Sequence, residues 1–83
     1  MRSKIADDLA MRLDEGGEVP VIVTLAPGGD VAELERSGLS VGRVFESIRA
    51  VSGTLTADVA RALDGSPQVE RIEYDGEAHA LGT

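Results

Sequence analysis

The sequence VPVIVTL, residues 19–25, has the clearest strand pattern in the chain. β-branched residues dominate this segment, and both of its alternating sets of positions are largely apolar. Such a run predicts a central strand that is covered on two sides. Pro20 has no amide donor, so we expect pairing with the neighbouring strands to begin just after it.

Three further segments have strand patterns. Residues 41–48 and Ala50–Leu55 predict two strands with a tight connection between them, and Val69–Tyr74 predicts the last strand. Within Ala50–Leu55, one alternating set of positions holds only small residues, namely Ala50, Ser52 and Thr54. A flat face of small residues suits docking against another protein, and the alternative interpretation is a face that is simply solvated.

Two short helices are expected between these strands. Asp30 is placed to cap the first helix, and Glu33, three residues later, is its expected capping-box partner. This helix should stop near Ser37, where Gly38 suits a left-handed C-terminal turn.

The second helix should follow a Thr56 cap and end at Gly65, because Pro67 prevents its continuation. The residues expected to face inward from it are Val59, Ala60, Ala62 and Leu63.

A further helix is predicted at the N-terminus. Ser3 can cap a helix that runs to about Asp14, with a narrow apolar stripe at Ile5, Leu9 and Leu13. Residues 15–17 then break it.

Leaving the N-terminal helix aside, the predicted order is strand, helix, strand, strand, helix, strand. Right-handed crossovers place both helices on one face of a single four-stranded antiparallel sheet. The expected fold is therefore a ferredoxin-like α+β sandwich with an extra N-terminal helix. The other face of the sheet stays uncovered unless the N-terminal helix folds beneath it.

Composition limits the size of the core and the possible partners. The chain has 83 residues, 42% of them hydrophobic, and no cysteine, so we expect one domain with a modest core and neither disulfides nor thiolate metal sites. The formal net charge of −7 repels nucleic acid, and Phe45 and Tyr74 are too few aromatic residues for a base-stacking surface.

The chain also lacks membrane and secretion signals. Its N-terminal run is interrupted by charged residues, unlike a signal peptide, and no apolar stretch approaches the ~20 residues of a membrane span. We expect a soluble protein made in the cytoplasm, although its target could be extracellular.

No catalytic constellation emerges from the sequence. His79 is the one histidine and lies in the C-terminal tail, while the carboxylate pairs at residues 7–8 and 14–15 are explained by helix ends. Residues 26–30, APGGD, precede a helix but lack the lysine and the spacing of a phosphate loop. We therefore predict no enzymatic activity, no metal site and no cofactor.

The end of the chain is unusual for a small domain. After the last predicted strand come Ala78, His79, Ala80 and Leu81, with no later segment for them to pack against. The sequence thus divides into an N-terminal helical extension (1–17), a globular part (18–75) and an extended tail (76–83).

An ordered set of residues is similar to the propeptides of subtilisin-type serine proteases and to the stand-alone inhibitors built on that propeptide fold. The set comprises Phe45, Ile48, AVSGTLT at 50–56, Val59, Leu63, PQV at 67–69, IEYD at 72–75 and AHAL at 78–81. The resemblance spans roughly three quarters of the chain, from about residue 19 to residue 81.

This resemblance implies a ferredoxin-like fold whose uncovered sheet face docks on two parallel surface helices of the protease. It also implies that the tail enters the active-site cleft like a cleaved product. Leu81 would fill the main specificity pocket, and Ala80, His79 and Ala78 would occupy the preceding subsites. Glu73 and Asp75 match the carboxylates that cap the amino ends of the two protease helices.

The resemblance therefore implies an inhibitor, and a folding chaperone, of a subtilisin-like serine protease that is a monomer when free. Met1, the lack of a secretion signal and the two residues after Leu81 favour a free-standing inhibitor over an excised prosegment. The alternative function is a ferredoxin-like regulatory or self-association module that pairs through its open sheet.

Overall fold

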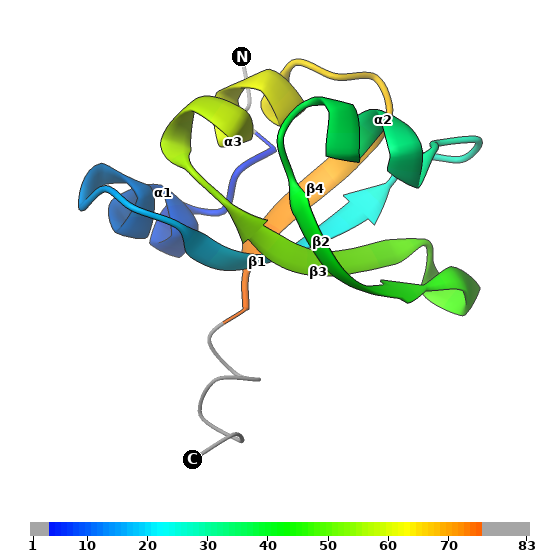
Figure 1. The fold of residues 1–83 in the computed structure, drawn as a ribbon, viewed down its shortest axis with the longest axis horizontal. Helices are drawn as coiled ribbons and strands as arrows, with labels where there is room; N and C mark the ends of the chain where they lie inside the picture. Colours follow the sequence, from blue (N-terminus) through cyan, green and yellow to red (C-terminus); the bar gives the residue numbers. More distant parts are fainter. Residues whose placement is uncertain (1–3, 76–83) are drawn as a thin grey trace.

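Four antiparallel strands form one sheet in the order β2-β3-β1-β4 in the computed structural model, which describes residues 4–75 (Figure 1). The elements follow in the order α1 (Asp7–Asp14), β1 (Val19–Leu25), α2 (Val31–Arg36), β2 (Ser40–Phe45), the 3-10 helix η1 (Glu46–Ile48), β3 (Ala50–Leu55), α3 (Ala57–Asp64) and β4 (Val69–Tyr74). This is the ferredoxin-like fold with an extra N-terminal helix, as predicted from the pattern.

The central strand β1 supplies the floor of the core. Its buried positions are Val19, Val21, Val23 and Leu25. The intervening residues are only half-buried, so one side of β1 is covered rather than two. With β3, pairing already begins at Val19, opposite Leu55, so the expected start after Pro20 is wrong for this neighbour. With β4, pairing begins at Val21, opposite Tyr74, as expected, and the carbonyl oxygen of Pro20 accepts from Asp75 N at 3.0 Å.

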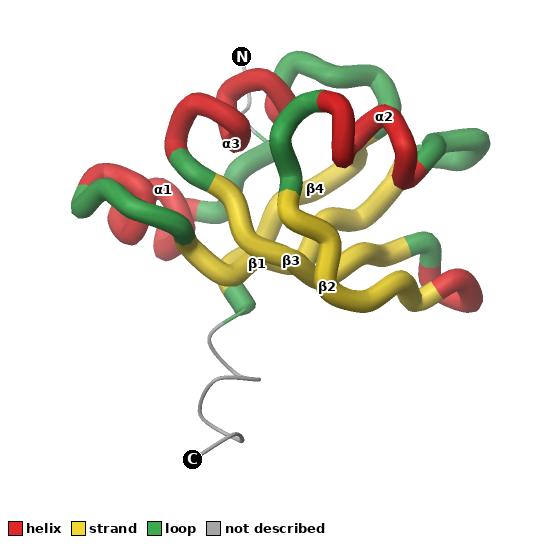
Figure 2. The backbone as a smooth tube through the Cα atoms, in the orientation of Figure 1, coloured by secondary structure: helices red, strands yellow, loops and turns green. Residues whose placement is uncertain are grey.

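All three α-helices contribute to one core on the same side of the sheet. The helix residues in this core are Leu9 and Leu13 of α1, Leu34 of α2, and Ala60 and Leu63 of α3. Figure 2 shows α2 and α3 on one side of the sheet, with α1 beside α3. The N-terminal helix therefore does not fold beneath the sheet, and no described helix covers the opposite face.

The N-terminal helix is shorter than predicted. Ser3 lies outside the described residues, and α1 begins at Asp7 after Ala6, which makes no side-chain cap. Ile5 instead forms a parallel bridge with Ile72, flanked by hydrogen bonds from Ala6 N to Ile72 O (3.0 Å) and from Ile72 N to the Lys4 carbonyl (2.9 Å). Pairing with β4 satisfies backbone groups at the edge of the sheet, and it replaces the first predicted turn.

The cap of α2 is confirmed only in part. Asp30 Oδ1 accepts from Ala32 N at 3.0 Å, but the Asp30 amide donates to Gln68 Oε1 at 2.8 Å rather than to Glu33. The Glu33 carboxylate pairs with Arg36 at 2.7 Å. The predicted capping box is therefore wrong in its second half, because a side chain from the turn before β4 takes that place.

Two further details differ from the pattern. The strand predicted over 41–48 ends at Phe45, since η1 and a left-handed Arg49 (φ 50°) form the connection to β3. In α3, Ala62 is exposed and not inward-facing, while Val59 is half-buried. Thr56 stands at the N-cap as predicted, although its side chain makes no capping hydrogen bond.

The backbone of β2 passes close to Gly53 of β3, and a substitution at Gly53 tests this approach. A Cβ at this position would collide with the carbonyl oxygen of Ser40. The register of the β2–β3 pair shifts nearby, between Val41 and Arg43 of β2. Because the obstacle is backbone, Gly53→Ala should lower the free energy of unfolding by about 1–3 kcal/mol in urea denaturation.

The matched control is Gly65→Ala at the end of α3. Gly65 has an ordinary φ of −87°, and a Cβ there would meet no atom closer than 3.9 Å. Its stability should be unchanged or raised by up to about 1 kcal/mol. Equal losses in the two variants would contradict the observed approach of β2 to β3.

Candidate functional site: the open sheet face

The sheet face turned away from the helices is the largest feature that the core leaves unused. Strand register defines it, because residues that alternate with the buried positions point to the opposite side. This open face comprises Pro20, Ile22 and Thr24 of β1; Ser40, Arg43 and Phe45 of β2; Ala50, Ser52 and Thr54 of β3; and Arg71 and Glu73 of β4.

The small residues predicted for docking lie on this face, but they are not equally accessible. Ser52 and Thr54 are half-buried, and so remain partly open to a partner. Ala50 is only 3% exposed and pairs across the strands with Phe45. Ala50 therefore contributes to the base of the face, while Phe45 offers contact area beside it.

A shallow hollow marks the middle of the open face. It has a volume of about 440 Å³ and is lined by Ile22, Gly42, Arg43, Phe45, Ser52 and Asp75. The guanidinium of Arg43 lies 6.0 Å from the centre of the Phe45 ring. Sequence reasoning did not assign Ile22 to this site, although its place between two buried valines was the available signal.

One row of cross-strand neighbours, called a rung here, brings polar and charged side chains of the site into line. Ser52 is opposite both Arg43 and Ile22, and Ile22 is in turn opposite Glu73. The rung thus crosses all four strands, with an arginine at one end and a carboxylate at the other.

The two predicted helix-capping carboxylates, Glu73 and Asp75, are brought to this same face. Glu73 is opposite Ile22, and Asp75 lines the hollow while its amide bonds to Pro20. Figure 2 shows the chain turning away from the helices directly after β4. The described chain therefore ends on the open-face side of the sheet.

Charge on the open face is balanced although the whole chain carries −7. Arg43 and Arg71 stand against Glu73 and Asp75. Arg71 and Glu73 approach to 3.8 Å, and their side chains are 65% and 47% exposed. Such an exposed pair contributes little to stability, so a partner could engage Glu73 at small cost.

The predicted cleft-binding residues cannot be placed. Ala78, His79, Ala80 and Leu81 lie outside the described residues.

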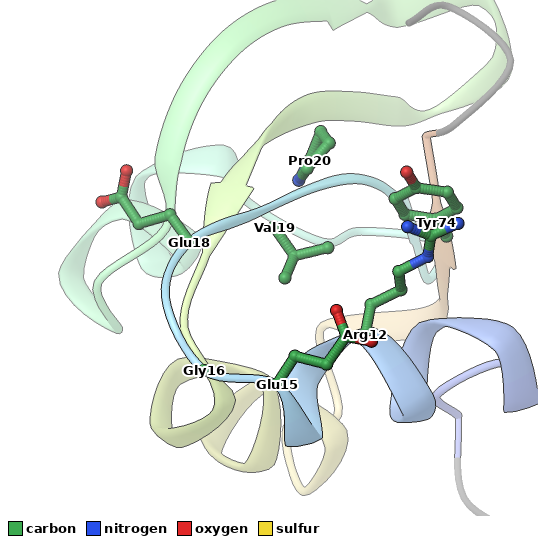
Figure 3. A pocket seen from close by; sticks show the side chains of 7 residues that line it. All are labelled: Arg12, Glu15, Gly16, Glu18, Val19, Pro20 and Tyr74. Carbon is green, nitrogen blue, oxygen red and sulfur yellow. The ribbon is translucent and has the colours of Figure 1, made fainter. Parts of the chain in front are cut away.

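A second hollow lies at the end of the sheet where β1 begins and β4 ends. It has a volume of about 170 Å³, and its lining includes Arg12, Glu18, Pro20 and Tyr74 (Figure 3). Arg12 Cζ is 4.5 Å from the centre of the Tyr74 ring. Sequence reasoning missed this contact, because nothing local links position 12 with position 74.

Residues 4–75 contain neither a cluster of metal-ligand side chains nor a helix that could span a membrane. No group of three or more His, Cys, Asp or Glu side chains is arranged there to hold a metal ion. No described helix is long and apolar enough to cross a membrane.

No model of a known protein family, no curated protein and no solved structure matches the chain. The fold, the open face and the tail sequence are therefore the features that bear on function.

Two isoleucines test whether the open face is free of internal packing. Ile72 is fully buried in the core, so Ile72→Ala should cost about 2–5 kcal/mol or prevent folding. Ile22 is half-buried on the open face, so Ile22→Ala should cost about 1 kcal/mol. Urea denaturation of both variants measures the difference, and similar losses would mean that the open face is part of the core.

Proposed function

We propose that this protein inhibits a subtilisin-like serine protease by docking its open face on the enzyme and inserting residues 78–81 into the active-site cleft. One observation carries the proposal. Glu73 and Asp75, the last two carboxylates of the described chain, lie on the face that no described helix covers, and only two residues separate Asp75 from the tail sequence AHAL.

The open face has the properties that helix docking requires. Ser52 and Thr54 have short side chains, so the backbone of a partner helix can approach the sheet closely. Carboxylates at helix N-termini meet unpaired amides and a favourable dipole, worth about 0.3–2 kcal/mol each depending on burial. Glu73 and Asp75 would supply two such contacts to two parallel helices.

The tail would bind by strand addition. An extended peptide on an exposed sheet edge gains affinity from backbone hydrogen bonds and specificity from alternate side chains. Leu81 would fill the main specificity pocket, with Ala80, His79 and Ala78 in the preceding subsites. Because a ligand of the folded state stabilises it by mass action, the same docking would also assist folding of the protease in trans.

Deleting residues 78–83 tests the substrate-like mode. All buried core residues lie between Leu9 and Ile72, so the deletion removes none of the described core. Inhibition of a purified subtilisin, followed with a chromogenic peptide, should weaken roughly 100-fold, which corresponds to about 2.7 kcal/mol. The circular dichroism melt should stay unchanged.

Unchanged inhibition after the deletion would reject insertion of the tail. Mass spectrometry of the mixture adds a second readout, since slow cleavage after Leu81 accompanied by loss of potency would mark a temporary inhibitor.

Self-association through the open face is the second candidate function. The observation that favours it is the presence of two arginines and two carboxylates on one face, which a two-fold-related copy could pair. Light scattering at several concentrations should then show a dimer whose stability does not depend on residues 78–83. A monomer at all concentrations would remove this candidate.

A further inference from the structure

The N-terminal helix α1 contacts the C-terminal end of β4. Arg12 of α1 places its guanidinium carbon 4.5 Å from the centre of the Tyr74 ring, at cation–π distance (Figure 3). Tyr74 is the last residue of β4. Arg12 lies in the segment 1–17, which is outside the span of the family resemblance, so the resemblance assigns it no role.

Tyr74 and Asp75 lie on opposite sides of the sheet. Tyr74 is opposite Val21, which is fully buried, so its ring is on the helix side where α1 packs. The next residue, Asp75, lines the hollow of the open face and donates its amide to Pro20 O at 3.0 Å. The Tyr74 ring is therefore the last side-chain anchor before the chain passes to the docking side.

We propose that Arg12 is a positioning residue, which holds Tyr74 against α1 and thereby fixes the end of β4 and the place of Asp75 at the open face. This inference rests on the proposed inhibitory function for its consequence, but its structural part can be measured without a protease. A partly exposed cation–π contact changes an equilibrium by about two- to fivefold. The role links α1, on the helix side of the sheet, to Asp75 at the open face.

The structural part is tested by hydrogen exchange of the Asp75 amide in the full chain, followed by NMR. Arg12→Ala should speed this exchange about two- to fivefold, and Arg12→Lys should restore part of the protection because the cation is kept. Arg61→Ala is the matched control, since it removes the same charge from an exposed position on α3. Unchanged Asp75 exchange in Arg12→Ala would overturn the inference.

The functional part is tested with the subtilisin assay on chains with and without residues 78–83. Arg12→Ala should weaken inhibition about two- to fivefold in the full chain, and it should have no effect once the tail is removed. An equal effect in both chains, or none in the full chain, would overturn the positioning role while leaving the inhibitory function intact. A wild-type chain that does not inhibit would overturn the proposed function, and the Asp75 exchange would then decide the structural part alone.

Discussion

The architecture depends on packing every described α-helix on one side of the sheet. The central strand β1 has apolar residues on both sides, yet its buried set is Val19, Val21, Val23 and Leu25, and all three helices contribute side chains to the core cluster that contains this set. Burying a side chain of this size contributes about 1.5–3 kcal/mol, and a chain of 83 residues has few such contributions to distribute. Using α1 to widen the same core leaves the second side of the sheet to other interactions.

The properties of the open face follow from the placement of all described α-helices on the other side of the sheet. Its apolar area is limited to half-buried side chains such as Ile22 and Phe45, and short polar side chains lie between them. Its positive and negative charges are balanced although the whole protein is acidic. A negatively charged partner would therefore not meet on this face the repulsion that the rest of the surface presents. These are features of a surface that can stay in water and still accept a partner.

The local sequence pattern was sufficient to predict those strands whose bounds depend only on their own residues. The bounds of β1, β3 and β4 agree with the predicted strands because alternating or β-branched residues are bounded there by turn residues. The placement of α2 and α3 on one face of the sheet followed from the handedness of the two crossovers, which holds for almost any sequence. The placement of Glu73 on the open face follows from alternation within β4.

Three of the misses share a physical cause, which is contact between distant parts of the chain. Lys4 and Ile72 are far apart in sequence, and nothing near Lys4 indicates that its carbonyl pairs with β4 rather than starting a helix. The amide of Asp30 is bonded by Gln68 and not by its near neighbour Glu33. Arg12 and Tyr74 also meet only once the sheet has formed.

Docking of a protease on the open face is tested most directly by NMR of the ¹⁵N-labelled protein titrated with a catalytically inactive subtilisin. We expect the largest shifts or broadening at the amides of Ile22, Ser52, Glu73 and Asp75, with the exposed sides of α2 and α3 little changed. Perturbations confined to the helices, or none at high micromolar protease, would contradict it.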